Sequence, residues 1–418
     1  MRVSPYTSLL AVCVAVTLAG CVATEPHSTK PDSTEPHSSP EAEFRFIDRD
    51  AASLKGPNNA ARGLFFSRDG SKLAVFGKDV AQVWHTTSWR LATEPLVHGD
   101  GLIHAQFNAA GTRLLTVSRI NYTATDQKGA LAKVWDIDTG KLAVPPIRHR
   151  ELPISDAAIS PDGQIIATCN HLDTSIHLWS ADTGRLIRSL KSKASVHWVE
   201  FHQIRQRLML ISTGQVITGE DEGSFRTQVW DVKQGAVKTV LPNGDVSPDN
   251  GSHASAKPIV SANHRIVIGV GVGFAVYDLD YGKLIATIDL DTDQYRLIHN
   301  FSISPKGDFV DVAGQFAGGA QSIWNLKTGD KFDITDFALF FDMLPMFDHQ
   351  SEVFAVGGLS AGIWDLRSRK RIRPLPSSDH FTRVAFNHDG STLAIAGTST
   401  VVVLTAKPKV VGPARWKR

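Results

Sequence analysis

Most of the chain consists of short apolar segments separated by polar turns. Residues 65–91, FFSRDGSKLAVFGKDVAQVWHTTSWRL, and residues 157–190, AAISPDGQIIATCNHLDTSIHLWSADTGRLIRSL, share one order of features. Each has an apolar segment, a turn like S-P-D-G, a second apolar segment, a polar loop, a third segment containing tryptophan, and another turn before a fourth segment. Alternation and frequent Val and Ile within the segments are typical of β-strands, and glycine suits the tight turns. The pattern predicts a repeated unit of four antiparallel strands.

The unit occurs eight times. A large apolar residue, usually tryptophan, marks the third strand of each unit, and successive marks are 40 to 51 residues apart. They are Trp84, Trp135, Trp179, Trp230, Tyr277, Trp324, Trp364 and Leu404. This period is typical of one four-stranded blade. We therefore predict an all-β, eight-bladed β-propeller of antiparallel blades. Seven blades are the alternative, if the weak unit at 257–277 is distorted.

Eight such units need one additional strand to complete the last blade. The segment EFRFID, residues 43–48, is the candidate that precedes the first unit. We expect it to form the outer strand of the last blade, so that the N- and C-terminal strands pair and leave no open sheet edge.

The repeat resembles the WD-repeat β-propeller family over residues 44–406. Four third strands keep tryptophan followed by Asp or Asn, and Tyr277-Asp278 is a near match. The third unit is most similar to the family pattern. There the resemblance implies that His149, Thr168, Asp173 and Trp179 form a buried hydrogen-bonded network. The Gly-His pair that the family places before the first strand is absent or degraded in the other units.

The N-terminus has the pattern of a bacterial secretion signal. Arg2 supplies a positive charge, residues 9–18 form an apolar run too short to span a membrane, and the small pair Ala19-Gly20 precedes Cys21. The L-A-G-C ending resembles the lipobox of bacterial lipoproteins. This resemblance implies a signal peptide at 1–20 and a lipidated Cys21, and Val22 after it favours the outer membrane. An ordinary signal peptide with an incidental cysteine is the alternative.

Residues 22–43, VATEPHSTKPDSTEPHSSPEAE, contain no aromatic residue and repeat T-E-P-H-S. Such a composition buries too little apolar surface to fold, so residues 21–43 are interpreted as the lipidated cysteine and a flexible tether. His27 and His37 are interpreted as solvated linker residues rather than metal ligands. Residues 407–418 are interpreted as a basic C-terminal tail.

Composition adds few constraints. The net charge is +2, which does not suggest a nucleic-acid partner. Cys13 leaves with the signal and Cys21 would be acylated, so Cys169 has no cysteine to pair with. Its apolar surroundings predict a buried, inert thiol.

The longest connections are expected on one face of the ring. Residues 118–131, 213–225 and 241–257 join second to third strands, or one blade to the next, and the family places both kinds on its top face. The candidate interaction residues in two of these connections are the aromatic residues Tyr122 and Phe225, expected to be exposed, and the acids Glu220, Asp221 and Glu222. Aromatic anchors in a polar rim are typical of docking surfaces. Plain solvated insertions are the alternative.

The opposite, bottom face is where the chain is expected to enter, because an outer strand runs from bottom to top. A basic run, RSRKRIRP at 367–374, precedes the closing blade, and the tail KPKVVGPARWKR follows it. One interpretation is that the two basic segments form a single positive patch that faces anionic lipid or an acidic partner. The alternative is that both segments are solvated chain.

Sequence motifs give no evidence of catalysis. The chain contains no H-E-x-x-H and no serine elbow, in which G-x-S-x-G joins a strand to a helix. GVGVG at 269–273 precedes a predicted strand, unlike a nucleotide loop. DLDTD at 289–293 has alternating carboxylates but lacks the glycine and the final glutamate of a calcium loop. No cofactor and no metal are predicted.

Together these features predict a non-enzymatic, membrane-anchored interaction scaffold on the periplasmic face of the outer membrane, which presents top-face loops to periplasmic proteins. The alternative is a propeller enzyme or ligand binder that uses the central channel. That function would need convergent acids, a metal or a vicinal cysteine pair near the axis, and the sequence alone indicates none.

Overall fold

The computed structural model describes residues 46–55, 61–98, 101–118, 131–149, 154–217, 219, 224–242, 257–270, 273–290, 295–316, 321–334, 346–356, 362–375, 383–397 and 400–406. The chain divides into two units, Met1–Glu43 and Phe44–Arg418. All described residues belong to the second unit, and every regular element among them is a β-strand. Within this part of the chain, no helix is long and apolar enough to cross a membrane.

The strands form eight antiparallel sheets of four strands each, and the first four follow the chain in order. Blade 1 is β2 (Gly63–Phe66), β3 (Lys72–Phe76), β4 (Val80–His85) and β5 (Leu96–Val97). Blade 2 is β6 (Leu102–Phe107), β7 (Arg113–Ser118), β8 (Ala132–Asp136) and β9 (Lys141–Leu142). Blade 3 is β10 (Asp156–Ile159), β11 (Ile165–Cys169), β12 (Ser175–Ser180) and β13 (Leu186–Lys191). Blade 4 is β14 (Ala194–Ile204), β15 (Arg207–Val216), β16 (Phe225–Asp231) and β17 (Ala236–Pro242).

The later sheets repeat the arrangement. Blade 5 is β18 (Ile259–Val260), β19 (Arg265–Val270), β20 (Gly273–Asp278) and β21 (Lys283–Asp289). Blade 6 is β22 (Tyr295–Ile303), β23 (Phe309–Phe316), β24 (Gln321–Asn325) and β25 (Lys331–Ile334). Blade 7 is β26 (Met346–Phe347), β27 (Val353–Val356), β28 (Gly362–Asp365) and β29 (Arg371–Pro374). Blade 8 is β30 (Arg383–Phe386), β31 (Thr392–Ala396), β32 (Thr400–Ala406) and β1 (Phe46–Lys55).

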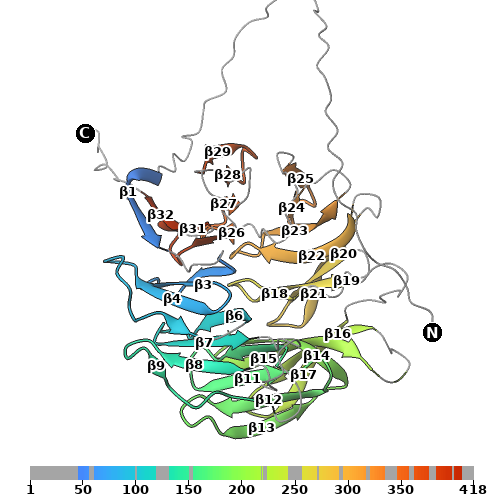
Figure 1. Cartoon of the computed structure of the whole chain (residues 1–418). Helices are drawn as coiled ribbons and strands as arrows, with labels where there is room; N and C mark the ends of the chain where they lie inside the picture. The colour runs from blue at the N-terminus through green and yellow to red at the C-terminus, as the bar shows by residue number, and fades with distance from the viewer. Residues whose placement is uncertain are drawn as a thin grey trace, which may run out of the picture. The chain divides into compact units, whose positions relative to one another are not determined.

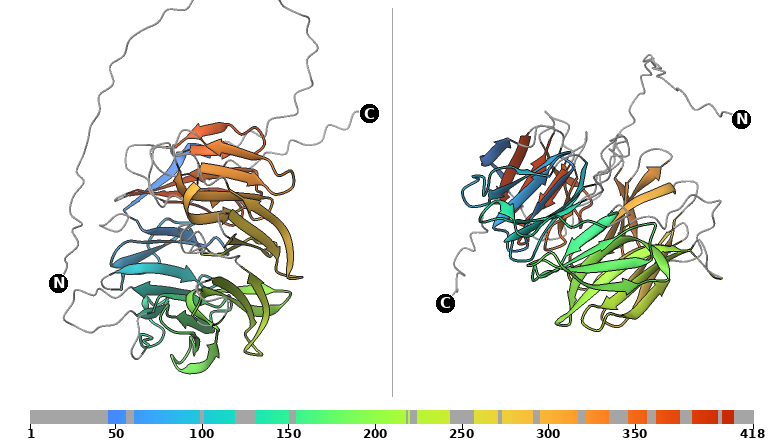
Figure 2. Two further views of the ribbon diagram at one scale, coloured as in Figure 1. Left: turned by 90° about the vertical axis from the view of Figure 1, so that its right-hand side faces the viewer. Right: turned by 60° about the horizontal axis from the view of Figure 1, so that its bottom comes forward.

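The sheets follow one another around a ring, and the first strand of each blade is its inner strand. Contacts between first strands join β6 to β10, β10 to β14, β18 to β22, β26 to β30 and β30 to β2. The last contact closes the ring, so the red end of the chain lies beside the blue end (Figure 1). Both views in Figure 2 show the same neighbourhood of blue and red strands. The predicted eight-bladed propeller is confirmed, and the seven-bladed alternative is wrong because β18 to β21 form a complete blade.

Ring closure depends on β1. It pairs antiparallel with β32, with Phe46 opposite Ala406 and Lys55 opposite Thr400, and an irregularity lies between Ile47 and Ala52. The predicted pairing of N- and C-terminal strands is therefore confirmed, although the strand begins and ends later than the expected 43–48. Because the third strand of each blade ends at the bottom face, Phe46 also lies at that face.

The core lies between neighbouring blades. Val75 of blade 1, for example, packs in one buried cluster with Val401 and Val403 of blade 8. Each blade has an apolar side against both neighbours, so burial of apolar surface stabilises the ring as a whole. The bottom-face turns depend on glycines such as Gly163 (φ 75°), where an added Cβ atom would lie only 2.7 Å from Asn108 Nδ2 of the preceding blade.

Candidate functional site

Most of the predicted interaction residues lie outside the described residues. These are Tyr122, Glu220, Asp221 and Glu222, together with the predicted lipidation residue Cys21. Phe225 is described and is the first residue of β16, opposite Gln215 in the sheet. Its side chain is only 7% exposed, and its ring centroid lies 5.5 Å from that of His197. The expectation that Phe225 is exposed is therefore wrong, because this residue belongs to the sheet rather than to the loop before it.

The strands that flank the long connections nevertheless have the expected topology. The connection after Ser118 joins β7 to β8, the one after Val216 joins β15 to β16, and the one after Pro242 joins β17 to β18. In an antiparallel blade the second and fourth strands end at the same face. All three connections therefore begin at the top face, opposite the end where Phe46 lies.

Three of the four residues of the implied network in blade 3 are linked by hydrogen bonds. Thr168 Oγ1 accepts a hydrogen bond from Trp179 Nε1 at 2.8 Å and lies 2.7 Å from His149 Nε2. Asp173 instead accepts hydrogen bonds from the backbone N–H and hydroxyl of Ser175, at 3.2 and 3.1 Å. Among the described contacts, no hydrogen bond joins Asp173 to His149, and the carboxylate acts on that ring only through its charge.

Blade 2 contains an equivalent set that sequence analysis missed. Thr116 Oγ1 accepts a hydrogen bond from Trp135 Nε1 at 2.8 Å and lies 2.7 Å from His98 Nδ1. The signal is visible in the sequence, since both histidines come three residues after a proline, in P-L-V-H and P-I-R-H. His98 does not match the Gly-His pair of the family pattern, because glycine follows this histidine instead of preceding it.

Blades 6 and 7 lack the hydroxyl at the same position of the second strand. Val312 and Val356 occupy it, each two residues after the residue opposite the blade's tryptophan. Accordingly the buried Nε1 atoms of Trp324 and Trp364 have no hydrogen-bond partner. In blade 4 the equivalent residue is Ser212, whose Oγ accepts a hydrogen bond from Trp230 Nε1 at 2.8 Å. Among the described contacts, the tryptophan–hydroxyl bond therefore occurs in blades 2, 3 and 4, and a histidine joins it in blades 2 and 3.

Burial keeps the two network histidines neutral. It lowers the pKa of His98 to about 4, with a further contribution from Lys133, and lowers that of His149 to about 4, with a further contribution from His177. Asp173 opposes the shift at His149 without reversing it. Each neutral imidazole ties the connection that carries it to a threonine on the second strand of a blade.

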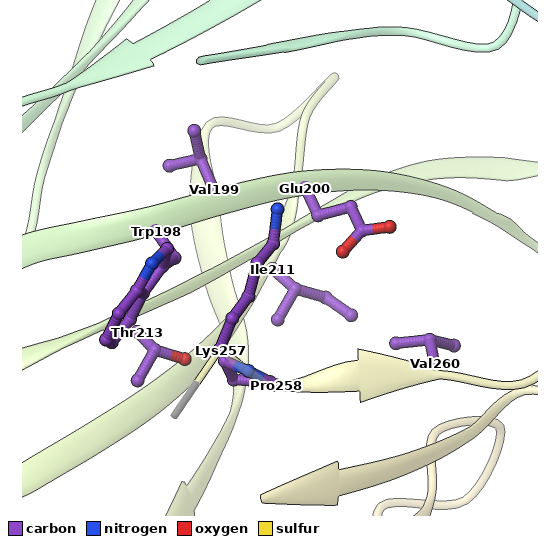
Figure 3. A pocket seen from close by; sticks show the side chains of 8 residues that line it. All are labelled: Trp198, Val199, Glu200, Ile211, Thr213, Lys257, Pro258 and Val260. Atoms are coloured by element: carbon purple, nitrogen blue, oxygen red, sulfur yellow. The ribbon is translucent and has the colours of Figure 1, made fainter. Parts of the chain in front are cut away.

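The inner strands carry a second cluster, made of charged groups from neighbouring blades. Lys257, which precedes β18, places its Nζ 3.7 Å from Asp156 Oδ2 at the start of β10. Asp156 Oδ2 also accepts a hydrogen bond from the backbone N–H of Val199 in β14, at 3.1 Å. Figure 3 shows the Lys257 side chain extending from beside Pro258 towards Val199 and Glu200, with Trp198 alongside.

Electrostatics keep this cluster ionised. Burial disfavours the charge on Glu200, but His202, whose Nε2 lies 3.5 Å from Glu200 Oε1, and Lys257 outweigh it and hold the pKa of Glu200 at about 2. Burial also disfavours the charge on Lys257, but Asp156 and Glu200 raise its pKa above the usual value. The lysine is therefore a cation between two carboxylates.

These contacts correct one expectation. Acids do converge on the inner strands, although the sequence alone indicated none. The two carboxylates come from different blades and meet a lysine from a third, so their spacing along the chain carries no signal. The described residues contain no group of three or more His, Cys, Asp or Glu able to hold a metal ion. The arrangement can brace blades 3, 4 and 5 and fix the end of the connection before Lys257.

Comparison with known proteins supports the repeat family and the fold. Residues 146–180, which carry the network of blade 3, match the family model described as WD domain, G-beta repeat. No curated protein matches the chain. A solved structure described as "Structure of Dos1 propeller" is similar, with a TM-score of 0.61 and 16% sequence identity, over 84% of this chain and 93% of that one.

The chain is a β-propeller, and its residues 146–180 match one WD-type repeat. At 16% identity the structural likeness supports the fold alone. The function must therefore be argued from the faces of this propeller.

Proposed function

We propose that this propeller is a non-enzymatic interaction scaffold, anchored by lipid at Cys21 to the periplasmic face of the bacterial outer membrane. Its top face binds periplasmic or outer-membrane proteins. The observation that carries the proposal is the polarity of the ring: the chain enters at the bottom face, where Phe46 lies opposite Ala406, and three long connections begin at the top face. A tether from Cys21 would therefore leave the top face turned away from the membrane.

Exposed aliphatic side chains at the top face support a docking role. Val97 ends β5 and is 65% exposed, Leu172 lies between β11 and β12 and is 62% exposed, and Ile217 follows β15 and is 46% exposed. All three lie at ends of strands that reach the top face. They would supply apolar contacts within a polar surface, a role for which Phe225 is too buried.

The absence of catalysis is part of the proposal. WD-type propellers are typically scaffolds, and the charged groups of the inner strands are already paired with one another. A channel ligand is the second candidate function, because Lys257, Asp156 and Glu200 do converge. Native mass spectrometry of the purified protein would reveal such a ligand as additional mass that is lost on denaturation.

Site-specific cross-linking in the native envelope tests the docking role. A photoreactive amino acid at position 172 or 217 should give discrete cross-linked species. In a second experiment the photoreactive residue replaces Tyr122, and the Leu172→Ser/Ile217→Ser variant should lose the cross-linked species that this probe gives in the otherwise wild-type chain. The matched control is Leu284→Ser/Ile285→Ser, which changes two exposed aliphatic residues on the outer strand β21. Equal cross-linking in both variants would exclude a top-face docking role for Leu172 and Ile217.

Metabolic labelling tests the anchor separately. Labelled palmitate should enter the wild-type chain and not the Cys21→Ser variant, and only the wild type should stay with membranes after a high-salt wash. Label in both chains, or in neither, would contradict the lipidation proposal while leaving the docking experiment valid.

A further inference from the structure

The bottom face of blades 5, 6 and 7 contains a groove lined mainly by cationic and amide side chains. Its walls are the turns between the first and second strands of three consecutive blades, with Arg265, Lys306 and His349 among the lining residues. The turns are joined to each other: Asn263 Nδ2 donates a hydrogen bond to Lys306 O at 2.6 Å, and Lys306 N donates one to Ser351 Oγ at 3.1 Å. The groove is therefore a fixed feature of the ring.

The groove has more positive than negative charge. Asp308 is its carboxylate, and it is shared by two cations, with Arg265 Nη1 at 3.5 Å from Oδ1 and Lys327 Nζ at 2.8 Å from Oδ2. Lys306 has no ion pair among the described residues and is exposed. Two positive charges therefore remain uncompensated within the groove.

The turn between β28 and β29 in blade 7 extends this positive surface. It contains the sequence R-S-R-K-R at 367–371, and the Arg367 side chain is 82% exposed. Arg367 pairs with Glu352 at 3.4 Å and Arg369 pairs with Asp330 at 3.7 Å. Lys370 and Arg371 have no ion pair among the described residues.

We define the basic face as this groove, the bottom-face turns of blades 6 and 7, and the strand residues that directly flank those turns. Its cations are Arg265, Lys306, Lys327, Lys331, Arg367, Arg369, Lys370 and Arg371. Its carboxylates are Asp308, Asp330, Asp348, Glu352 and Asp365. Eight cations against five carboxylates give the basic face a formal charge of +3, which exceeds the +2 of the whole chain.

The basic face also lies next to the place where the chain enters the propeller. Blade 7 contacts blade 8 through β26 and β30, and β1 of blade 8 begins at Phe46 on the same bottom face. The first described residue of the propeller, Phe46, therefore lies at the same face as these cations, in the blade that follows blade 7.

We propose that the basic face docks on an anionic lipid surface, so that the tethered propeller lies with its bottom face against the membrane. This inference rests on the proposed lipid anchor. The proposed tether would keep the propeller near the membrane, and at contact the screened field of anionic headgroups acts over about 10 Å. Exposed Lys and Arg side chains bind such a surface through charge, and the concave groove offers a site for a headgroup phosphate.

The proposed lipid anchor favours a membrane over an acidic protein as the partner of the basic face. A soluble acidic partner would need to enter the space between the bottom face and the bilayer, whereas lipid headgroups are already there.

Vesicle co-sedimentation of residues 22–418 tests the proposal. This chain contains β1 to β32, and therefore the whole closed ring, but lacks Cys21 and the signal. The wild-type sequence should bind phosphatidylcholine vesicles that contain phosphatidylglycerol, should not bind pure phosphatidylcholine vesicles, and should dissociate as salt is raised. Since each cation strengthens partitioning about fivefold, the Lys306→Gln/Lys370→Gln variant should bind about 25-fold more weakly.

The matched control is Lys78→Gln/Lys193→Gln, which removes two exposed charges from the top face. It should bind as the wild type does, and circular dichroism should show that both variants remain folded. Equal wild-type binding to both vesicle types, no binding to either, or an equal loss in the control variant would overturn the proposal. Because Cys21 is absent from this chain, none of these outcomes bears on lipidation, and failure of palmitate labelling would leave them unchanged.

Discussion

Phe46 and Ala406 lie opposite each other in the eighth blade, so the first and last strands of the propeller share one sheet. We expect the ring to open most easily where β1 leaves β32, because other neighbouring blades are also joined by the covalent chain and by hydrogen bonds between their connections, such as that from Ala109 N–H to Pro161 O at 2.8 Å. The same pairing places the N-terminal entry and the C-terminal exit at the bottom face. Stability and orientation therefore depend on the same strand.

The first prediction concerns the pairing of β1 with β32. A chain that begins at residue 44 should unfold at the same temperature as one that begins at residue 22, because residues 22–43 precede β1. A chain that begins at residue 61 loses β1 and should unfold at a clearly lower temperature, with a cost on the order of several kcal/mol. Differential scanning calorimetry measures the difference. Equal midpoints for all three chains would show that β32 needs no partner.

Sequence pattern predicted the blades because each blade repeats the same local requirements. Turn glycines and an anchor such as Trp135 or Trp179 recur at a fixed place, and these positions are set by contacts within one blade. The closing strand was predicted because eight units of this kind lack one strand. Its bounds were wrong by several residues, although the pair Gly56-Pro57 directly after Lys55 is a turn signal that marks the end of β1 in the sequence.

Side-chain sites that combine several blades were not predictable in this way. Asp156 and Lys257 are separated by more than two blades of sequence, and nothing near either residue marks the other. Phe225 illustrates the opposite error: it follows an acidic loop in the sequence, yet its side chain faces His197 inside the sheet. Exposure at the edge of a loop depends on strand register, which a hydropathy pattern does not fix within one residue.

The second prediction concerns the hydroxyl shared by tryptophan and histidine. Thr168→Val and Thr116→Val keep the shape of the side chain but leave an indole N–H and an imidazole nitrogen unpaired. Each should lower the free energy of unfolding by about 1–3 kcal/mol. Urea unfolding followed by tryptophan fluorescence measures this. A cost near zero for both variants would show that these hydrogen bonds make no net contribution.

The converse substitution provides a matched comparison. Val312→Thr and Val356→Thr each place a hydroxyl where Trp324 or Trp364 has a buried, unpartnered Nε1. These variants should stay within about 1 kcal/mol of the wild type, because the new group gains a donor. Val267→Thr, at a fully buried apolar position on the other side of the second strand of blade 5, places a hydroxyl in an apolar cluster and should be destabilising by about 1–3 kcal/mol. Equal costs at the three positions would contradict the interpretation.

The third prediction is a loss of stability in mild acid. His98 has a folded-state pKa of about 4, below the ordinary value of 6.5, so the unfolded chain binds more protons between these values. The stabilising effect of the neutral ring is complete above about pH 6.5 and is lost as pH falls towards 4. At about pH 5 this residue alone should lower the free energy of unfolding by about 2 kcal/mol, with a smaller effect from the more exposed His149.

Urea titrations at about pH 7.5 and pH 5 measure this effect. The His98→Gln variant should be less stable than the wild type at neutral pH but should show a smaller change between the two conditions. A wild-type stability that rises on acidification would contradict the assignment of His98 as a neutral, buried group.

The last prediction concerns the lysine between two carboxylates. Lys257→Met keeps the aliphatic stem but leaves Asp156 and Glu200 without their shared cation, so it should lower the free energy of unfolding by about 1–3 kcal/mol. Asp156→Asn should be less costly in the Lys257→Met background than in the wild type, with a coupling of about 1–2 kcal/mol. The pKa of Glu200, followed by carboxyl NMR, should rise when the lysine is removed, because Lys257 is one of the charges that lower it.

Lys193→Met, at an exposed lysine on the same face, is the control and should change neither the coupling energy nor the pKa of Glu200. If the double-mutant cycle closes without coupling and the pKa of Glu200 stays near 2, Lys257 does not brace the inner strands, and the fixed start of blade 5 must depend on its apolar contacts with blade 4.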